Sequence, residues 1–210
     1  MEVKAYQLKI TLQELETVWR CVVVPEGITF KALHDVIQYA MGWTDSHLYQ
    51  FVIEEEKIKM VGSQVEMDEY ADCDQVRFTV RGRVEPSSWC YQLSSSQQID
   101  EYLRAYKKLE YVYDMGDDWV HTIELLGIVD SYEHGYPICL EGSGDCPPED
   151  CGGIGGYLGL LEILNDPEHP EFEEMQQWIE EIGYEGEFDL DWINKCMATD
   201  LNFKKIGRSH

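Results

Sequence analysis

The chain has 210 residues, 44% of them hydrophobic, which is enough for one domain with a sizeable core. Its 16 lysines and arginines against 41 aspartates and glutamates give a net charge of −25, a field that repels nucleic-acid phosphates and anionic membrane surfaces. Direct nucleic-acid binding is therefore disfavoured, and no apolar run approaches the roughly 20 residues that span a bilayer.

The number and distribution of the cysteines help to predict the cellular compartment. The seven cysteines are an odd number, are scattered along the chain and follow no basic-plus-apolar leader. This distribution does not fit a disulfide framework. We expect a cytoplasmic protein that makes no membrane contact.

The N-terminal part predicts strands around one helix. Alternating apolar residues over 3–12 and a β-branched run over 17–24 predict a strand pair. Thr29 is placed to cap a helix over 30–41. A period of two over 47–54 predicts the next strand, which completes an order of strand, strand, helix, strand.

The middle of the chain has weaker patterns. We interpret 54–74 as a surface connection and 75–81 as a strand. Proline and serine make 84–97 the most linker-like region, so a lobe boundary within the domain should lie there. An amphipathic helix is predicted over 99–109.

Two strand-like runs, Tyr111–Met115 and Trp119–Leu126, flank Gly116-Asp117-Asp118, a composition typical of a hairpin turn. Helical spacing then predicts a short helix from about Tyr157, an acidic helix over 170–182 and a last helix capped by Asp189. We expect a single α+β domain over 1–203, with a mixed β-sheet that includes the central hairpin, helices packed on it and gathered toward the C-terminus, and a disordered basic tail over 204–210.

The hairpin supplies the first group of candidate site residues. His121 could act as a base, a metal ligand or a substrate contact beside the acids Asp114, Asp117 and Asp118. Turn aspartates more often satisfy backbone amides, however. His121 also shares a strand face with Trp119, so its alternative interpretation is a buried core histidine.

The second group lies in the loop that contains Cys139, Cys146 and Cys151, with Glu149 and Asp150 as further catalytic candidates. The C-x6-C-x4-C spacing is a weak zinc signal that would need His121, His134 or another group as fourth ligand. We therefore expect reduced, metal-free cysteines and no cofactor, with zinc as the alternative. The glycines that follow could form an anion cradle, but no lysine or arginine lies between Lys108 and Lys195 to support one.

Three strings carry a family resemblance: YVYDMGDDWVHTIELL, CLEGSGDCPPEDCGGIGGY and the N-terminal YQLKITL with the VWRCVVVP that follows it. In this order and spacing the chain resembles the plasmid pRiA4b ORF-3-like family, with Met115 where relatives usually have phenylalanine. The resemblance spans most of the chain. It implies an α+β fold and an association with plasmids and transposable elements, but no particular activity.

Two classes of function remain open, and the sequence does not decide whether the protein is an enzyme. The first is a non-enzymatic acidic interaction or adaptor protein that binds a basic protein partner, with mimicry of a DNA backbone as the extreme form. The second is a hydrolase-like or metal-dependent enzyme that uses the Asp/His hairpin and the Cys-Pro-Pro-Glu-Asp-Cys loop. A pocket that joins hairpin and loop would favour the second.

Overall fold

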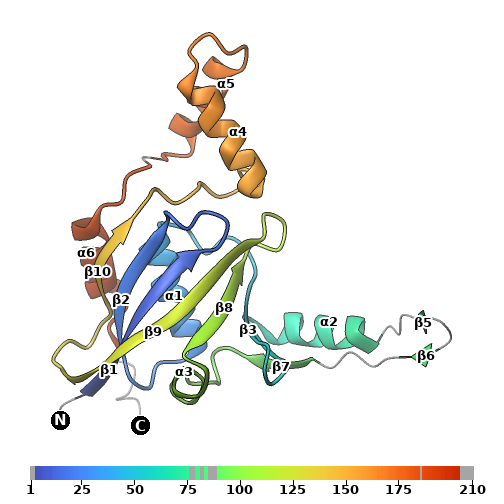
Figure 1. Cartoon of the computed structure of the whole chain (residues 1–210), viewed down its shortest axis with the longest axis vertical. Helices are drawn as coiled ribbons and strands as arrows, with labels where there is room; N and C mark the ends of the chain where they lie inside the picture. Colours follow the sequence, from blue (N-terminus) through green and yellow to red (C-terminus); the bar gives the residue numbers. More distant parts are fainter. Residues whose placement is uncertain (1–2, 76–78, 81–82, 85–88, 185, 204–210) are drawn as a thin grey trace.

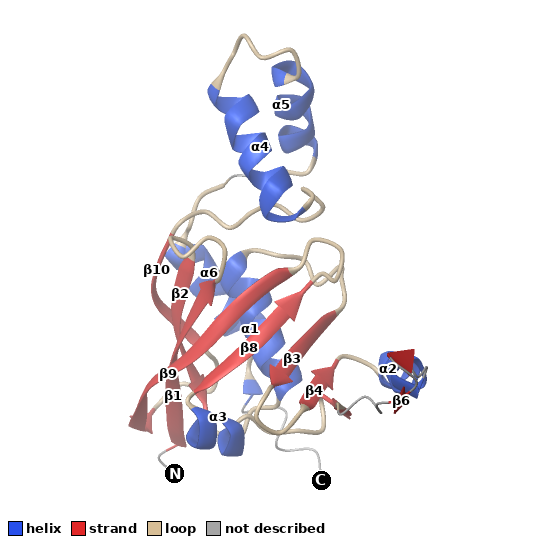
Figure 2. Ribbon diagram, turned by 45° about the vertical axis from the view of Figure 1, so that its right-hand side comes forward, coloured by secondary structure: helices blue, strands red, loops and turns tan. Residues whose placement is uncertain are grey.

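A computed structural model describes residues 3–75, 79–80, 83–84, 89–184 and 186–203. Its body is an eight-stranded mixed sheet (Figures 1 and 2). The strands of this sheet are β1 (Val3–Leu12), β2 (Trp19–Pro25), β3 (Tyr49–Ile53), β4 (Ile58–Val61), β7 (Cys90–Leu93), β8 (Lys108–Tyr113), β9 (Trp119–Tyr132) and β10 (Ile138–Ser143). They lie in the order β10-β2-β1-β9-β8-β3-β4-β7. Neighbours are antiparallel except β4 and β7, which are parallel.

Six helices and a short strand pair complete the described residues. The helices are α1 (Phe30–Met41), α2 (Gln64–Gln75), α3 (Asp100–Tyr106), α4 (Gly153–Asn165), α5 (Phe172–Glu181) and α6 (Leu190–Asp200), and the pair is β5 (Thr79–Val80) with β6 (Arg83–Val84). The predicted α+β class with a mixed sheet is confirmed. No helix in the described part of the chain is both long enough and apolar enough to cross a bilayer.

Helix α1 covers one face of the sheet and forms the core with it (Figure 2). Its start and end follow from the sequence as predicted, because the Thr29 side chain accepts a hydrogen bond from the Ala32 amide and Gly42 ends the helix at φ 87°. The buried face of β1 supplies Tyr6 and Leu8 to this core. The alternation seen in the sequence is thus the alternation between the core face and the outer face of the sheet.

The predicted hairpin is confirmed as β8 and β9, with Tyr113 opposite Trp119 next to the turn. Trp119 is 2% exposed and His121 is fully buried. Strand β9 continues to Tyr132 and pairs with β1 along most of its length. The hairpin therefore lies in the middle of the sheet.

A buried arginine ties the end of α1 to the sheet. Arg20, 2% exposed, donates from Nε to the carbonyl of Ala40 in the last turn of α1 and from Nη1 to Trp19 and Ser143. Its Nη2 donates to Gly144. These carbonyls, including one at the negative end of the helix dipole, solvate a guanidinium that has lost its water.

Two segments project from this body (Figure 1). Helices α4 and α5 pack on each other as a helical arm beyond one end of the sheet, and a return segment over 182–189 leads back to α6. Helix α2 with β5 and β6 extends sideways from the β4 and β7 edge. We call α4 and α5 the α4–α5 arm.

Several predicted elements need correction. The stretch 54–74 is not only a connection, since it contains β4 and most of α2. The sequence patterns also did not predict β10 or the extension of β9 to Tyr132. Helix α4 begins at Gly153 rather than near Tyr157. The lobe boundary predicted within 84–97 stays a prediction, and the described part of this region contains β7, which pairs with β4. The predicted strand 75–81 lies partly outside the described residues, and the tail 204–210 lies wholly outside them.

Truncation of Trp119 to alanine is expected to cost roughly 3–5 kcal/mol of unfolding free energy, because a large buried ring leaves a cavity. Chemical denaturation measures this directly. The matched control is Trp192→Ala, which removes a ring that is 59% exposed and should change stability little. Equal stability of Trp119→Ala and the parent protein would refute the role of the hairpin as the centre of the core.

Candidate functional site

The hairpin turn and the cysteine loop converge at one end of the sheet. Asp117 at the turn accepts a hydrogen bond from the Gly152 amide through Oδ2 at 3.1 Å. A Cβ built on Gly153, which has φ +65°, would lie 2.7 Å from the Asp117 carbonyl oxygen. Only a glycine allows this approach. We call this contact between turn 114–118 and loop 146–153 the junction.

The turn aspartates mainly shape the turn. Asp114 is 8% exposed, and its Oδ1 accepts from the Gly116 amide at 2.8 Å and from the Asp117 amide at 3.3 Å. Asp114 and Asp118 both have positive φ, 57° and 56°. This is the structural alternative considered for these residues, because the carboxylates satisfy backbone amides in a tight turn.

Glu149 fastens the loop to the segment after α1. Its Oε2 accepts from the Thr44 hydroxyl at 2.6 Å and the Thr44 amide at 3.1 Å, and its Oε1 accepts from the Tyr113 hydroxyl. Nearby, Trp43 donates from its indole to the Pro147 carbonyl at 2.9 Å. Both oxygens of this catalytic candidate are therefore committed to positioning the loop.

Asp150 and Asp114 meet at a histidine that the sequence analysis did not select. His47 lies 3.6 Å from Asp114 through Nδ1 and 3.4 Å from Asp150 through Nε2. The pairing of β3 with β8 brings this about, because the Asp114 amide donates to the Leu48 carbonyl. One ligand atom from each of the three side chains lies within 4.8 Å of the others, while the Asp150 side chain is 75% exposed.

His121 belongs to the core. Its Nδ1 donates to the Trp119 carbonyl at 2.9 Å, and its ring lies edge-on to Trp43 at a centroid distance of 5.3 Å. Burial lowers its pKa from 6.5 to about 4, with the backbone carbonyls of Trp119 and Tyr111 acting in the opposite direction. Among the described residues it joins no group of metal-binding donors.

The three loop cysteines are free thiols. Cys139 and Cys146 are buried, and Cys151 is half-buried. Burial raises the pKa of Cys139 to about 11 and of Cys151 to about 12, and it raises that of Cys146 further. Among the described side chains, no cysteine takes part in a cluster of three or more potential metal ligands.

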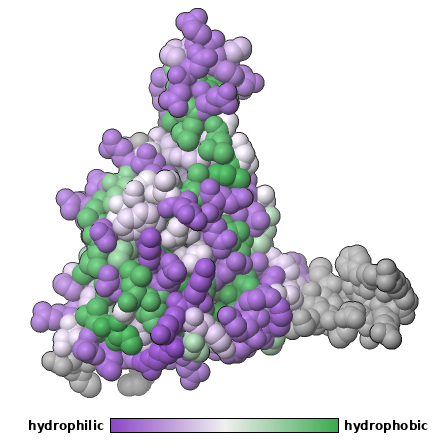
Figure 3. All heavy atoms as spheres, in the orientation of Figure 1, coloured by the Kyte–Doolittle hydropathy of each residue, from purple (hydrophilic) through white to green (hydrophobic). Residues whose placement is uncertain are grey.

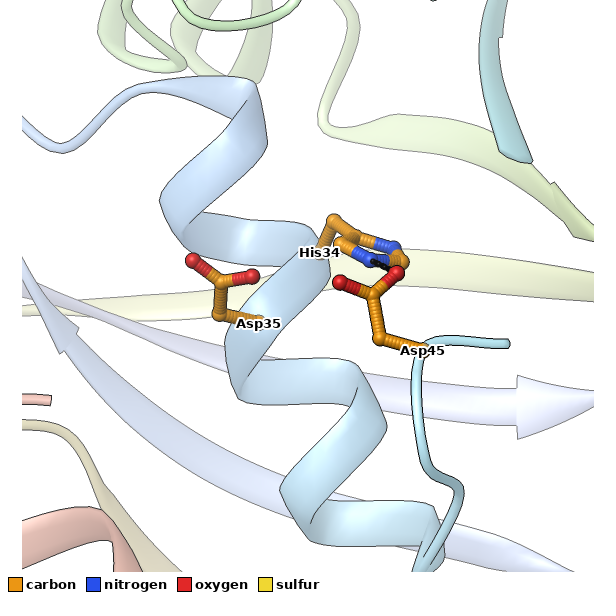
Figure 4. Close-up of side chains that lie close together, drawn as sticks. All are labelled: His34, Asp35 and Asp45. Carbon is orange, nitrogen blue, oxygen red and sulfur yellow. Dashed lines mark hydrogen bonds and ion pairs between the residues drawn. The ribbon is translucent and has the colours of Figure 1, made fainter. Parts of the chain in front are cut away.

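A second histidine cluster lies under α1 (Figure 4). His34 is fully buried, contacts Asp45 through Nε2 at 2.7 Å and Tyr111 through Nδ1 at 2.8 Å, and stacks on Tyr49. Figure 4 shows the Asp45 carboxylate against the ring and Asp35 on the other side of the helix ribbon. Gln38 closes the network, since it donates to the Tyr111 hydroxyl and accepts from the Asp45 amide.

Burial also lowers the pKa of His34 from 6.5 to about 4, although Asp45 favours the protonated ring. A neutral imidazole donates from one nitrogen and accepts at the other. Here Nε2–H donates to Asp45 and Nδ1 accepts from Tyr111, so every member has a partner. The donors of His34, Asp35 and Asp45 lie within 4.8 Å of one another, but both His34 nitrogens are already committed to the protein.

A cleft opens beside the junction. Its volume is about 840 Å³, and it lies between the end of α1, the segment 43–46, loop 146–150, the return segment 182–189 and α6. Five aromatic side chains and four carboxylates contribute to its lining: Tyr39, Trp43, Tyr184, Phe188, Trp192, Glu149, Asp150, Glu187 and Asp189. No local sequence pattern predicts this cleft, because its walls come from Arg20 and three stretches that are far apart in the chain, 39–46, 146–150 and 182–196.

A family model described as plasmid pRiA4b ORF-3-like protein matches residues 4–196. The chain belongs to this family. It is 34% identical over 188 residues to the uncharacterized protein y4hQ of Sinorhizobium fredii, which covers 88% of this chain and 86% of that protein. It also resembles the crystal structure of MM3350 from Methanosarcina mazei, a protein of unknown function, with a TM-score of 0.70, 29% identity, and coverage of 91% of this chain and 98% of that one.

The junction accounts for two of the strings that carry the resemblance to the plasmid pRiA4b ORF-3-like family. The GDDW string forms the turn and the first residue of β9, and the CPPEDCGG string forms the loop that rests on it. Gly156 lies just as close to its neighbour, since a Cβ there would be 1.8 Å from the Cys151 carbonyl oxygen. The residues of these strings therefore serve mainly to let backbone segments pack closely against each other.

The junction can be tested with a pair of glycines. Gly153→Ala is expected to lower the unfolding free energy by about 1–3 kcal/mol, because it places a Cβ against Asp117 at a positive φ. Gly155→Ala in the same helix meets open space and should be neutral or stabilising by about 0.5–1 kcal/mol. Denaturant titration of both variants measures the two unfolding free energies and so tests the junction. A Gly153→Ala protein as stable as Gly155→Ala would rule out a tight junction.

The buried histidines predict a pH dependence. Their folded-state pKa values, about 4, lie below 6.5, so the unfolded chain binds protons first as the pH falls. Stability should be complete above pH 6.5 and decline toward pH 4, at up to about 1.4 kcal/mol per pH unit for each histidine. His121→Phe should reduce that slope between pH 6.5 and 5, whereas replacement of the exposed His134 by glutamine should not. A slope that His121→Phe leaves unchanged would contradict this account.

Proposed function

We propose that the protein is a non-enzymatic interaction protein whose acidic surface binds a basic segment of a partner protein. One observation carries the proposal. No lysine or arginine occurs between Lys108 and Lys195, while 23 of the 41 acidic residues lie there. This segment supplies the hairpin, the junction loop, the α4–α5 arm and much of the cleft lining. Such a field attracts cationic partners and speeds their association.

The α4–α5 arm presents part of this charge away from the body. Helix α5 has no buried residue, and its apolar residues Phe172, Met175, Trp178 and Ile179 are half-buried. Its four glutamates, Glu173, Glu174, Glu180 and Glu181, are exposed. Figure 3 shows a hydrophilic arm tip above apolar residues nearer its base. The arm is thus accessible to a partner from several sides.

The proposal has three further parts: a cytoplasmic location, a non-enzymatic role and an association with a mobile genetic element. The cysteines with described side chains are all free, which supports a cytoplasmic location. The positions of Glu149 and Asp114 support a non-enzymatic role, because their carboxylates hold the loop and the turn. The resemblance to a family associated with plasmids and transposable elements supports a role in such an element.

A peptide titration tests the proposal. A labelled 12-residue peptide rich in lysine and arginine should bind saturably at 50 mM salt, and its affinity should fall at least tenfold at 300 mM, as for a charge-driven contact. Reversal of Glu173, Glu174 and Glu180 to lysine should weaken binding. The matched control reverses Glu54, Glu55 and Glu56, three exposed acids outside this segment, and should leave binding nearly unchanged. A peptide with glutamine in place of each cation should not bind.

The same titration uses duplex DNA as a negative control. We expect negligible affinity at 100 mM salt, because neutralisation of phosphates requires a basic patch. Two findings would overturn the proposal: absence of saturable peptide binding, or salt-sensitive binding of duplex DNA. DNA binding would require a local basic surface from Arg77, Arg81, Arg83 and 204–208, of which only the Arg83 backbone is described.

The second candidate, a hydrolase-like or metal-dependent enzyme, is favoured by the convergence of His47, Asp114 and Asp150 beside the cleft. An imidazole between two carboxylates can act as a general base or bind a divalent cation. Against it, the hydroxyls of Thr44 and Ser46 in the cleft lining bond to each other at 2.6 Å, and Thr44 also bonds to Glu149.

Metal analysis separates the two candidates. We expect no stoichiometric zinc in the untagged purified protein and no saturable binding of Mn²⁺ or Zn²⁺ in a calorimetric titration. Metal binding that Asp150→Asn abolishes would favour the enzyme and locate the ion beside His47. Bound zinc that Cys146→Ser releases would instead locate it in the cysteine loop.

A further inference from the structure

The cleft beside the junction has the composition of a site for a cation. Its rings offer negative faces, and the exposed side chains Asp150, Glu187 and Asp189 add negative charge at its rim. A cation over an aromatic face is attracted by the ring quadrupole, and adjacent carboxylates strengthen that attraction. Glu149 contributes further negative charge beneath the loop.

Among the described residues that line the cleft, Arg20 is the one lysine or arginine, and it is poorly placed to attract an anion. Four of its five N–H groups are donated to carbonyls, and its guanidinium lies over the Phe188 ring with a carbon-to-centroid distance of 4.3 Å. Its charge is therefore shielded by main chain on one side and by a ring on the other, and the rest of the lining is neutral or acidic.

Trp192 is the most accessible ring in this lining. It is 59% exposed, and Lys195 from the next turn of α6 already lies 5.4 Å from its centroid. The chain thus places its own Lys195 ammonium group by this ring, and enough of the Trp192 ring stays exposed to contact a second cation. The backbone of Trp192 serves the helix cap through Asp189, whereas its side chain contributes little to the core.

We infer that the cleft binds a lysine or arginine side chain presented by the basic partner segment, with Trp192 as the ring that contacts it and the rim carboxylates around it. The inference rests on the proposed function and adds the place where a single cationic side chain is recognised. The volume of about 840 Å³ accommodates such a side chain together with adjoining backbone.

The decisive variant is Trp192→Ala, because it removes the ring and leaves every charge in place. It should weaken binding of the lysine- and arginine-rich peptide at least fivefold, and Trp192→Phe should restore most of the loss. The matched control is Trp89→Ala, which removes a ring that lies by Lys57 and Lys59 near the opposite edge of the sheet. Thermal melts confirm that all three variants are folded.

The outcomes separate the two proposals. If the parent protein binds the peptide and Trp192→Ala binds it equally well, the cleft inference is overturned and the acidic interaction protein stands. If the parent protein does not bind the peptide, the proposed function fails, and the inference fails with it. Equal binding of a peptide with norleucine in place of its lysines and arginines would show an apolar cleft without cation recognition and would also overturn the inference.

Discussion

The contact between turn 114–118 and loop 146–153 is the constraint on which the candidate site depends. It joins the turn in the middle of the sheet to the loop between β10 and α4. Because Gly153 lies against the Asp117 carbonyl, the loop has one available position on the turn. Glu149 and Pro147 then reach Thr44 and Trp43. The junction therefore fixes one wall of the cleft and brings His47 between two carboxylates.

The molecule keeps its few internal charges apart from its acidic surface. Inside, Arg20 is solvated by carbonyls, and His34 is neutral in a closed network with Tyr111 and Gln38. These arrangements satisfy polar groups that are costly to bury unpaired. Outside, the carboxylates of the α4–α5 arm and the cleft rim face solvent. The segment without lysine or arginine can thus carry a strong negative charge at the surface without burying unpaired charges in the core.

Much of the fold could be predicted from local patterns. Thr29, Gly42 and the period of two around Trp119 determined α1 and the hairpin, because caps and turns depend on neighbouring residues. The burial of His121 followed from its strand face. Strand β10 and the start of α4 were missed because β10 is a short strand on the edge of the sheet, and α4 begins within glycines that a helix disfavours but the junction requires.

The candidate site was predicted only in part. The sequence identified the hairpin and the loop as the site region but assigned chemistry to residues that mostly position backbone, such as Asp114 and Glu149. His47 was overlooked because its place beside the turn depends on the pairing of β3 with β8, which local sequence patterns do not predict. The cleft depends on the meeting of Arg20 with three separate stretches of chain, and local sequence patterns do not predict which distant stretches meet.

Amide hydrogen exchange of the full chain, with and without a saturating lysine- and arginine-rich peptide, tests the account most directly. The account predicts slower exchange in the peptide complex over 43–46, 146–150 and 184–192, the segments that line the cleft. Amides of β4, β7 and α2, at the opposite edge of the sheet, should exchange at unchanged rates. Protection confined to that edge, with no change around the cleft, would contradict the account.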